Sequence, residues 1–168
     1  MNKIAFSFLL LLLVFCVADA KTSYCDEPNI DDVVTPFEKA AYEGDAKAQW
    51  LLGFLYREGK GVRQDYTKAR EWFEKAAAQG DAEAQCGLGF LYYEGKGVIQ
   101  DYTKAREWFE KAAAQGDATA QLSLGVLYYE GKGVRQNSIM AKEWFGKACD
   151  GGLQVGCDNY KKLNLQSR

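Results

Sequence analysis

Residues Ala82–Asp117 read AEAQCGLGFLYYEGKGVIQDYTKAREWFEKAAAQGD and form one unit of an internal repeat. The residues immediately before it, Ala46–Asp81, repeat the same string with only five differences. A looser third copy follows at Ala118–Leu153. A fixed internal period of this length predicts a repeat architecture in which each unit packs against the next. The chain is therefore expected to stack three copies of one structural unit.

Each copy has the pattern of two helices separated by a turn. In the first half of the first copy, apolar residues such as Ala48 and Leu52 recur at helical spacing. The glycine-rich stretch Glu58–Gly61 ends this helix, because glycine readily adopts a left-handed backbone. Asp65 is the predicted N-cap of the second helix, which is expected over residues 66–79.

A glycine interrupts the middle of each first helix, at Gly53, Gly89 and Gly125. Glycine inside a helix costs about 1 kcal/mol relative to alanine, so its recurrence predicts a close approach between two helices. Ala76 and Ala77 are the small residues expected to face it. One such hairpin cannot bury its own apolar face, whereas stacked copies can. The predicted fold is all-α: an α/α solenoid of 36-residue helix-turn-helix repeats, with about eight helices in total.

The repeated residues also carry a resemblance to a known family. The shared pattern is A-x-A-x-x-x-L-G-x-x-Y-x-x-G-x-G-V, a short spacer, and A-x-x-W-F-x-K-A-A. It resembles the Sel-1-like repeat, a relative of the tetratricopeptide repeat with a longer loop between its two helices. In the first copy the matching residues are Ala46, Ala48, Leu52, Gly53, Tyr56, Gly59, Gly61, Val62, Ala69, Trp72, Phe73, Lys75, Ala76 and Ala77. The match covers roughly residues 34–165.

The repeat register predicts seven segments. Residues 1–20 are expected to be a signal peptide, 21–33 an acidic leader, 34–45 a half repeat that supplies one capping helix, 46–81, 82–117 and 118–153 the three full repeats, and 154–168 a C-terminal capping helix. The end units of a solenoid are expected to depart from the repeat pattern, because one of their faces meets water.

The first segment has the composition of a secretory signal peptide. Lys3 precedes an apolar run, Ile4–Val17, and residues 18–20 read Ala-Asp-Ala, a typical cleavage site. The run is short for a membrane span of about 20 residues, although an uncleaved anchor is the alternative. We therefore expect an exported protein, periplasmic or secreted, with no stable membrane insertion after cleavage.

The composition argues against several classes of function. The chain contains no histidine, which excludes Ser-His-Asp and Cys-His centres and HExxH metal sites. It also contains no C-x-x-C and no S-x-x-K sequence. Its net charge is −2 and its lysines and arginines do not cluster, so a nucleic-acid partner is not expected. The prediction is a monomer with no catalytic residue, no cofactor and no metal.

The resemblance further implies a disulfide bond between Cys149 and Cys157. A subgroup of Sel-1-like proteins, the Helicobacter cysteine-rich proteins, is similar in carrying cysteine pairs at this spacing that bridge adjacent helices; two free thiols are the alternative. Cys25 and Cys86 have no partner in the pattern, and pairing together, staying free or linking to another chain all stay open. Some members of the subgroup have been linked to weak β-lactam hydrolysis. A hydrolase of β-lactams or cell-wall fragments is therefore the alternative function.

The first helix of each repeat carries a second apolar stripe beside its core stripe, beyond what packing requires. In tetratricopeptide-like solenoids, which this chain resembles, the first helices line the concave side. The predicted partner-binding residues on that side are Trp50, Phe54, Arg57, Phe90, Tyr93, Leu122, Val126 and Tyr129. Exposed aromatic residues usually mark interfaces. The stripe therefore predicts a groove for a protein or peptide partner, with packing of the leader into the groove as the alternative.

The differences between the first two copies point to the same surface. The five differing pairs are Lys47/Glu83, Trp50/Cys86, Leu51/Gly87, Arg57/Tyr93 and Arg63/Ile99. Three of the five fall on the second stripe, whereas no residue of the predicted core changes. This favours a variable binding surface on a constant scaffold, although simple drift of exposed positions is the alternative.

Overall fold

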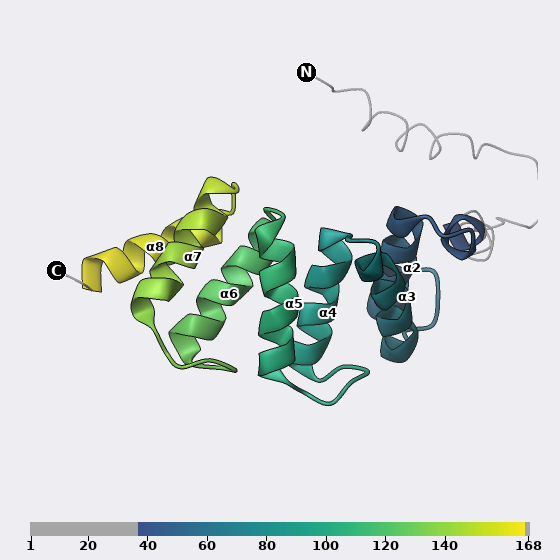
Figure 1. Ribbon diagram of the computed structural model, residues 1–168, viewed down its shortest axis with the longest axis horizontal. Helices are drawn as coiled ribbons and strands as arrows, with labels where there is room; N and C mark the ends of the chain where they lie inside the picture. The colour runs from purple at the N-terminus through teal and green to yellow at the C-terminus, as the bar shows by residue number, and fades with distance from the viewer. Residues whose placement is uncertain (1–36, 167–168) are drawn as a thin grey trace, which may run out of the picture.

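The described part of the chain is entirely helical. The computed structural model describes residues 37–166, and within that range it contains eight helices and no strand (Figure 1). Residues 37–42 form the first helix, and the others are α2 (Ala46–Glu58), α3 (Tyr66–Ala78), α4 (Ala82–Glu94), α5 (Tyr102–Ala114), α6 (Ala118–Glu130), α7 (Ser138–Asp150) and α8 (Gln154–Gln166). The all-α prediction is confirmed. The predicted signal peptide, the acidic leader and Cys25 lie outside the described residues.

The helices follow one another in a single row, from residues 37–42 at one end to α8 at the other (Figure 1). Within the repeats, α2 packs against α3, α4 against α5, and α6 against α7. Contacts of α3 with α4, α5 with α6 and α7 with α8 then join each repeat to the next. This arrangement is the predicted α/α solenoid.

Local hydrogen bonds set the helix ends in every repeat. The N-cap residues, whose side chains accept backbone N–H bonds from the first turn, are Asp45, Asp65, Asp81, Asp101, Asp117 and Asn137. Gly59 ends α2 with a left-handed backbone, at a φ of 69°, and the equivalent glycines end α4 and α6 in the same way. These ends depend on residues close together in sequence, which is why the sequence pattern predicts them.

A glutamine fastens each inter-helix loop to the helix before it. The side chain of Gln64 donates to the backbone carbonyl of Arg57 at 2.8 Å. Gln100 and Gln136 make the same hydrogen bond in the second and third repeats. The loops are therefore held in one shape, although they contain several glycines.

The glycine inside each first helix lies against an aromatic ring. A Cβ atom added to Gly53 would lie 2.7 Å from the ring of Phe73, and one added to Gly89 would lie 2.5 Å from Phe109. The predicted close approach is confirmed, but the prediction of its partner was wrong. The helix packs against the phenylalanine of the second helix and not against Ala76–Ala77, because the long ring reaches across the space between the helices.

A buried glutamine spans the junctions between repeats. Gln49 donates to the carbonyl of Ala41 at 3.0 Å across the first junction, and Gln121 makes the same bond across the third at 3.4 Å. At the last junction both positions are cysteines, and the disulfide Cys149–Cys157 joins them. The disulfide therefore stands where this hydrogen bond stands at the first and third junctions.

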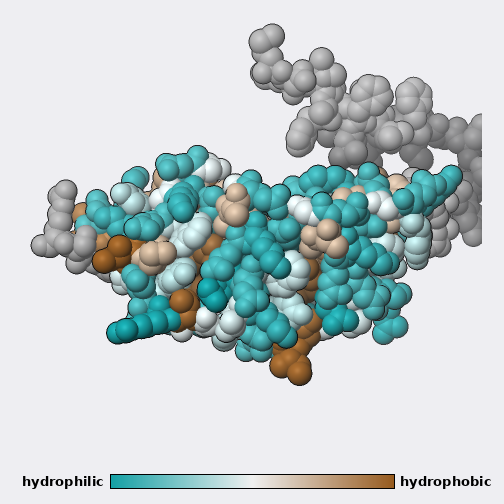
Figure 2. All heavy atoms as spheres, in the orientation of Figure 1, coloured by the Kyte–Doolittle hydropathy of each residue, from teal (hydrophilic) through white to brown (hydrophobic). Residues whose placement is uncertain are grey.

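The face seen in Figure 2 is mostly hydrophilic, with small and separate hydrophobic patches. One patch projects from the lower edge of this view (Figure 2). Ile99, in the loop between α4 and α5, is 91% exposed. Isolated apolar residues of this kind are common on soluble proteins. A candidate site therefore has to be sought where several apolar side chains line one hollow.

Candidate binding groove

The first helices of the three repeats lie next to one another. Helix α2 contacts α4, and α4 contacts α6, in addition to their contacts with the second helices. A hollow of about 240 Å³ opens beside α4 and α6, and we call it the groove. Its lining residues are Phe90, Tyr93, Phe109, Thr119, Leu122, Ser123 and Val126. It contains four of the eight predicted partner-binding residues: Phe90, Tyr93, Leu122 and Val126.

The apolar walls of the groove are anchored in the core of the solenoid. The ring of Phe90 meets the buried ring of Phe109 edge-on, with 5.1 Å between their centroids. On the other wall, Leu122 and Val126 pack against the buried cluster that contains Phe145. Each wall residue is half-buried, so one face of its side chain is fixed by the core while the other faces the hollow.

A polar edge borders the groove at Tyr93. The hydroxyl of Tyr93 accepts a hydrogen bond from Lys132 at 3.2 Å, and Lys132 also forms an ion pair with Glu130 at 2.9 Å. Hydrogen bonding to Glu130, and secondly to Tyr93, raises the pKa of Lys132 above its usual range. The Tyr93 ring also meets the Tyr102 ring edge-on at 5.3 Å. The groove therefore combines apolar walls with a cation and a carboxylate at one end.

A second, more polar hollow adjoins the groove. It measures about 440 Å³, and its lining residues are Arg57, Glu58, Gln64, Tyr66, Phe90, Glu94 and Lys96. Phe90 lines both hollows, and Arg57 is a further predicted partner-binding residue. Some of the charged side chains that line this second hollow form ion pairs with each other, such as Arg57 with Glu58 at 2.8 Å. Five of the eight predicted residues therefore line one or other of two adjoining hollows.

The prediction that Trp50 and Phe54 are not needed for packing was wrong. Their rings stack with centroids 6.0 Å apart, and both pack against the buried cluster around Phe73 and Leu88. Each is half-buried. The guanidinium of Arg57 lies 5.1 Å from the centre of the Phe54 ring, which covers part of the remaining face. These two aromatic residues therefore help to hold the first repeat against the second.

Cys86 and Gly87 contradict the view that only exposed positions differ between the first two copies. Cys86 is 6% exposed and belongs to the core cluster around Phe109. Burial, and secondly the carboxylate of Asp117, raise the pKa of the Cys86 thiol far above its usual range. At Gly87 an added Cβ would lie 3.0 Å from the Phe73 ring, so this difference also falls in the core. The structure shows Cys86 as a free, buried thiol.

Sequence reasoning missed an ion pair that joins two repeats. Lys47 of the first repeat pairs with Asp81 at 2.9 Å and with Glu83 of the second repeat at 2.5 Å. Lys47 and Glu83 are one of the five pairs at which the first two copies differ. The two copies therefore carry opposite charges at this position, and the two side chains form an ion pair. Comparing each differing residue with its counterpart one repeat away could have revealed this pair.

A comparison with protein-family models decides the family. The model of the Sel1 repeat matches three times, at residues 46–81, 82–117 and 118–153. The chain belongs to the Sel1 repeat family. A comparison with curated protein sequences gives no match.

Several solved Sel1 repeat structures are similar to this chain. A protective antigen present in uropathogenic Escherichia coli strains, which displays an SLR fold, is 41% identical with a TM-score of 0.74; the match covers 76% of this chain but only 27% of the antigen. A Sel1 repeat protein from Oxalobacter formigenes is 36% identical with a TM-score of 0.68, over 79% of this chain and 98% of that one. Helicobacter pylori cysteine rich protein B is 29% identical with a TM-score of 0.61, over 75% and 96%. The chain thus spans about a quarter of the antigen's length and almost the whole of the other two.

Two further findings concern the described residues alone. Within residues 37–166, no group of three or more cysteine, aspartate or glutamate side chains is placed to hold a metal ion. In the same range, no helix has the length and apolar character that crossing a membrane requires.

Proposed function

We propose that this Sel1 repeat protein is an exported scaffold that binds a protein or peptide partner in the groove, as a monomer and without catalysis of its own. The observation that carries the proposal is the apolar hollow formed by Phe90, Tyr93, Leu122 and Val126. These side chains come from two different repeats, so the hollow exists only because the repeats are stacked. Half-buried aromatic and aliphatic residues that are fixed by the core are typical of the centre of an interface.

The size and edge of the groove favour a peptide side chain as its occupant. Its volume of about 240 Å³ is smaller than the roughly 300–1,000 Å³ of pockets for drug-sized molecules. An apolar side chain of a partner would fill it, while Lys132 and Glu130 could bond to the partner's backbone or polar groups. Ser123 does not favour the alternative of a hydrolase, because its hydroxyl already donates to the carbonyl of Thr119 at 2.8 Å.

The first prediction concerns Leu122→Asp. A carboxylate at this half-buried wall should abolish peptide binding, because burying it against Phe90 and Val126 would cost several kcal/mol without a partner. The measurement is selection from a random peptide library on the full chain, followed by titration of the selected peptides. Peptides with one large apolar residue at a constant position are expected for the unaltered protein.

The matched control is Ile139→Asp, which makes the same kind of change at a residue of α7 that is 73% exposed and outside the groove. Peptide affinity should stay within about twofold of the unaltered protein, and circular dichroism should show the same helix content for both variants. Equal loss of binding in the two variants, or selected peptides with no shared apolar residue, would contradict the groove.

The second prediction concerns export. We expect the mature protein to begin at Lys21, because Ala-Asp-Ala precedes it and follows the apolar run. N-terminal sequencing of protein recovered from outside the cytoplasm checks this. Recovery of the chain with Met1 retained in the membrane fraction would support an uncleaved anchor instead.

A further inference from the structure

The inter-helix loops of the second and third repeats rest on the second helix of the preceding repeat. A Cβ atom added to Gly97 would lie 2.6 Å from the backbone of Tyr66, the first residue of α3. Gly133 meets the backbone of Tyr102, the first residue of α5, in the same way. Both glycines have positive φ, at 68° and 66°, so each loop both needs glycine for its backbone and has no room for a side chain.

In each of these two repeats, a lysine of the loop also lies over the ring of the tyrosine that the loop contacts. The ammonium group of Lys96 lies 5.3 Å from the centre of the Tyr66 ring, and that of Lys132 lies 5.4 Å from the Tyr102 ring. A cation over the face of an aromatic ring is attracted to the electron density of that ring. The loop and the helix start beneath it therefore form one packing unit in each of these repeats.

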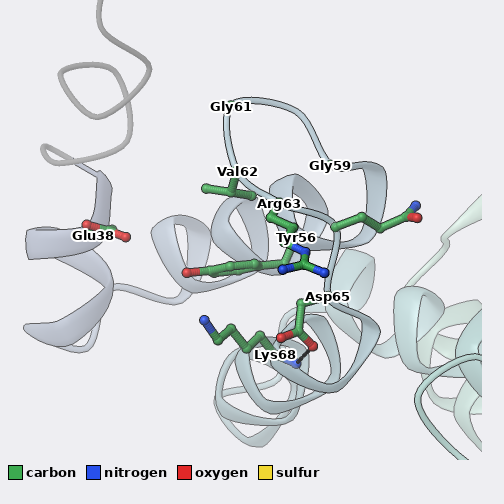
Figure 3. Close-up of a pocket in the computed structure, with 9 residues that line it drawn as sticks. Glu38, Tyr56, Gly59, Gly61, Val62, Arg63, Asp65 and Lys68 are labelled. Atoms are coloured by element: carbon green, nitrogen blue, oxygen red, sulfur yellow. Dashed lines mark hydrogen bonds between the residues drawn. The ribbon is translucent and has the colours of Figure 1, made fainter.

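The first loop has the same sequence but a hollow beside it. It reads Gly-Lys-Gly-Val at residues 59–62, and Gly61 has a φ of 73° like its counterparts. A hollow of about 810 Å³ lies here, and its lining residues are Glu38, Tyr56, Gly59, Gly61, Val62, Arg63, Gln64, Asp65 and Lys68. In Figure 3 the ring of Tyr56 lies across the hollow below Val62, with Glu38 on the opposite wall.

The repeat register identifies the segment that corresponds to the start of α3 at this position. Counting back one repeat from Tyr66 gives Ile30, and counting back from the buried Ala69 gives Val33. Asn29 takes the place of the N-cap residues Asp65 and Asp101 and is itself a residue type that caps helices. The segment ends only a few residues before Phe37, where the described chain begins. Glu38, the next residue, lines the hollow, so the segment is close to the hollow along the chain.

The hollow offers two cations to the acidic segment, beside the carboxylates of Glu38 and Asp65. Asp31 and Asp32 lie in the segment, while Arg63 and Lys68 line the hollow. The carboxylate of Asp65, which also lines the hollow, accepts hydrogen bonds from the start of α3. Acidic side chains brought to this place would meet the two cations.

We propose that residues 29–33 of this chain dock in the hollow beside the first inter-helix loop. Ile30 then takes the place of Tyr66 under the loop, and Val33 faces the helix that follows. The docked segment covers the N-terminal end of the solenoid and leaves the groove free for a partner. The leader is thus an internal cap and does not compete for the groove.

Hydrogen exchange of the full chain tests this placement. Ile30→Asp should speed exchange at residues 59–64 by about tenfold, as expected for the loss of roughly one local packing contact. Exchange at residues 95–100 and 131–136 should not change. The matched control is Tyr66→Asp, which should speed exchange at residues 95–100, because Tyr66 lies under that loop in the structure.

Two results would overturn the proposal. Unchanged exchange at residues 59–64 in Ile30→Asp would mean that the segment does not touch the loop. Faster exchange at residues 90–93 and 119–126 instead would mean that the leader occupies the groove. If Ile30→Asp fails to fold, Ile30→Tyr decides. It places under the first loop the same residue type that Tyr66 places under the second, in addition to the Phe54 ring that Lys60 already contacts at 5.3 Å. Exchange of the first loop should then slow, and unchanged exchange would equally overturn the proposal.

Discussion

The third and the last junctions of the solenoid use the same two positions with different chemistry. Between α5 and α6, Gln121 is buried and donates to the carbonyl of Ala113 at 3.4 Å. Between α7 and α8, Cys157 and Cys149 occupy those positions and form a disulfide. Helix α6 is covered by α5 on one side and α7 on the other, whereas α8 packs mainly against α7.

The difference shows how much a junction depends on its surroundings. A hydrogen bond is worth more when it is kept from water, and an interior junction is covered on both sides. At the last junction Val155 and Leu165 of α8 are 57% and 73% exposed, so water reaches the outer face of this helix. A covalent bond holds the two helices together there without depending on burial.

The largest effect is expected from Leu127→Ala, compared with Leu163→Ala at the equivalent place one repeat later. Leu127 is fully buried, so removing its side chain should leave a cavity and lower the free energy of unfolding by about 2–5 kcal/mol. Leu163 is 7% exposed in the last helix, where neighbouring side chains can move into the space more freely, so its loss should fall at the low end of that range. Urea titration of the two variants measures the difference. A larger loss for Leu163→Ala would show that the end of the solenoid is packed as tightly as its interior.

The next effect concerns the disulfide. Cys149→Ser with Cys157→Ser should lower the free energy of unfolding by about 2–3 kcal/mol, because the short closed loop no longer restricts the unfolded chain. Urea titration without reductant checks this, and the same titration with reductant on the unaltered protein should give a similar loss.

A second double variant serves as the matched control for the disulfide. Cys149→Ala with Cys157→Gln copies the interior junction and should recover about 1 kcal/mol, the usual net value of one hydrogen bond. Full recovery would show that burial at the last junction is as complete as in the interior. No recovery would show that the glutamine bond forms only where both sides of the junction are covered.

The smallest effect is expected from Lys47→Ala, which removes the ion pairs that join the first two repeats. Because the Lys47 side chain is 69% exposed and screened by solvent, the loss should be only about 0.2–1 kcal/mol and should shrink at high salt. Hydrogen bonds to Glu83, and secondly to Asp81, raise the pKa of Lys47 above its ordinary value.

The pH dependence of this pair follows from the direction of the shift. A lysine whose pKa is higher in the folded state contributes its full stability below its unfolded pKa of about 10.4, and that contribution is lost as the pH rises further. The stability difference between the unaltered protein and Lys47→Ala should therefore be constant near pH 8 and shrink above about pH 10.4. Thermal unfolding of the two proteins near pH 8 and above about pH 10.4 measures this stability difference. A difference that grows at high pH would contradict the ion pair.

The period of the repeat, the ends of the helices and the class of fold could all be predicted from the amino-acid sequence. These features depend on neighbouring residues, such as Asp65 capping the helix that follows it and Gly59 ending the helix before it. Because each copy contains the same capping and helix-ending residue types, a correct prediction of the helix ends in one copy applies to all three. The spacing of apolar residues also shows which face of a helix is buried within its own hairpin.

Which residues meet between repeats could not be predicted from the sequence and depends on how the repeats pack. Helical periodicity does not specify how far one hairpin is rotated against the next, and that rotation determines what covers a residue at the edge of the buried face. Cys86, which takes the place of Trp50 on the predicted second stripe, is thereby buried, whereas Leu122 is left half-exposed in the groove. The same rotation packs Trp50 and Phe54 onto the core and brings Phe90 across from Leu122 in one hollow.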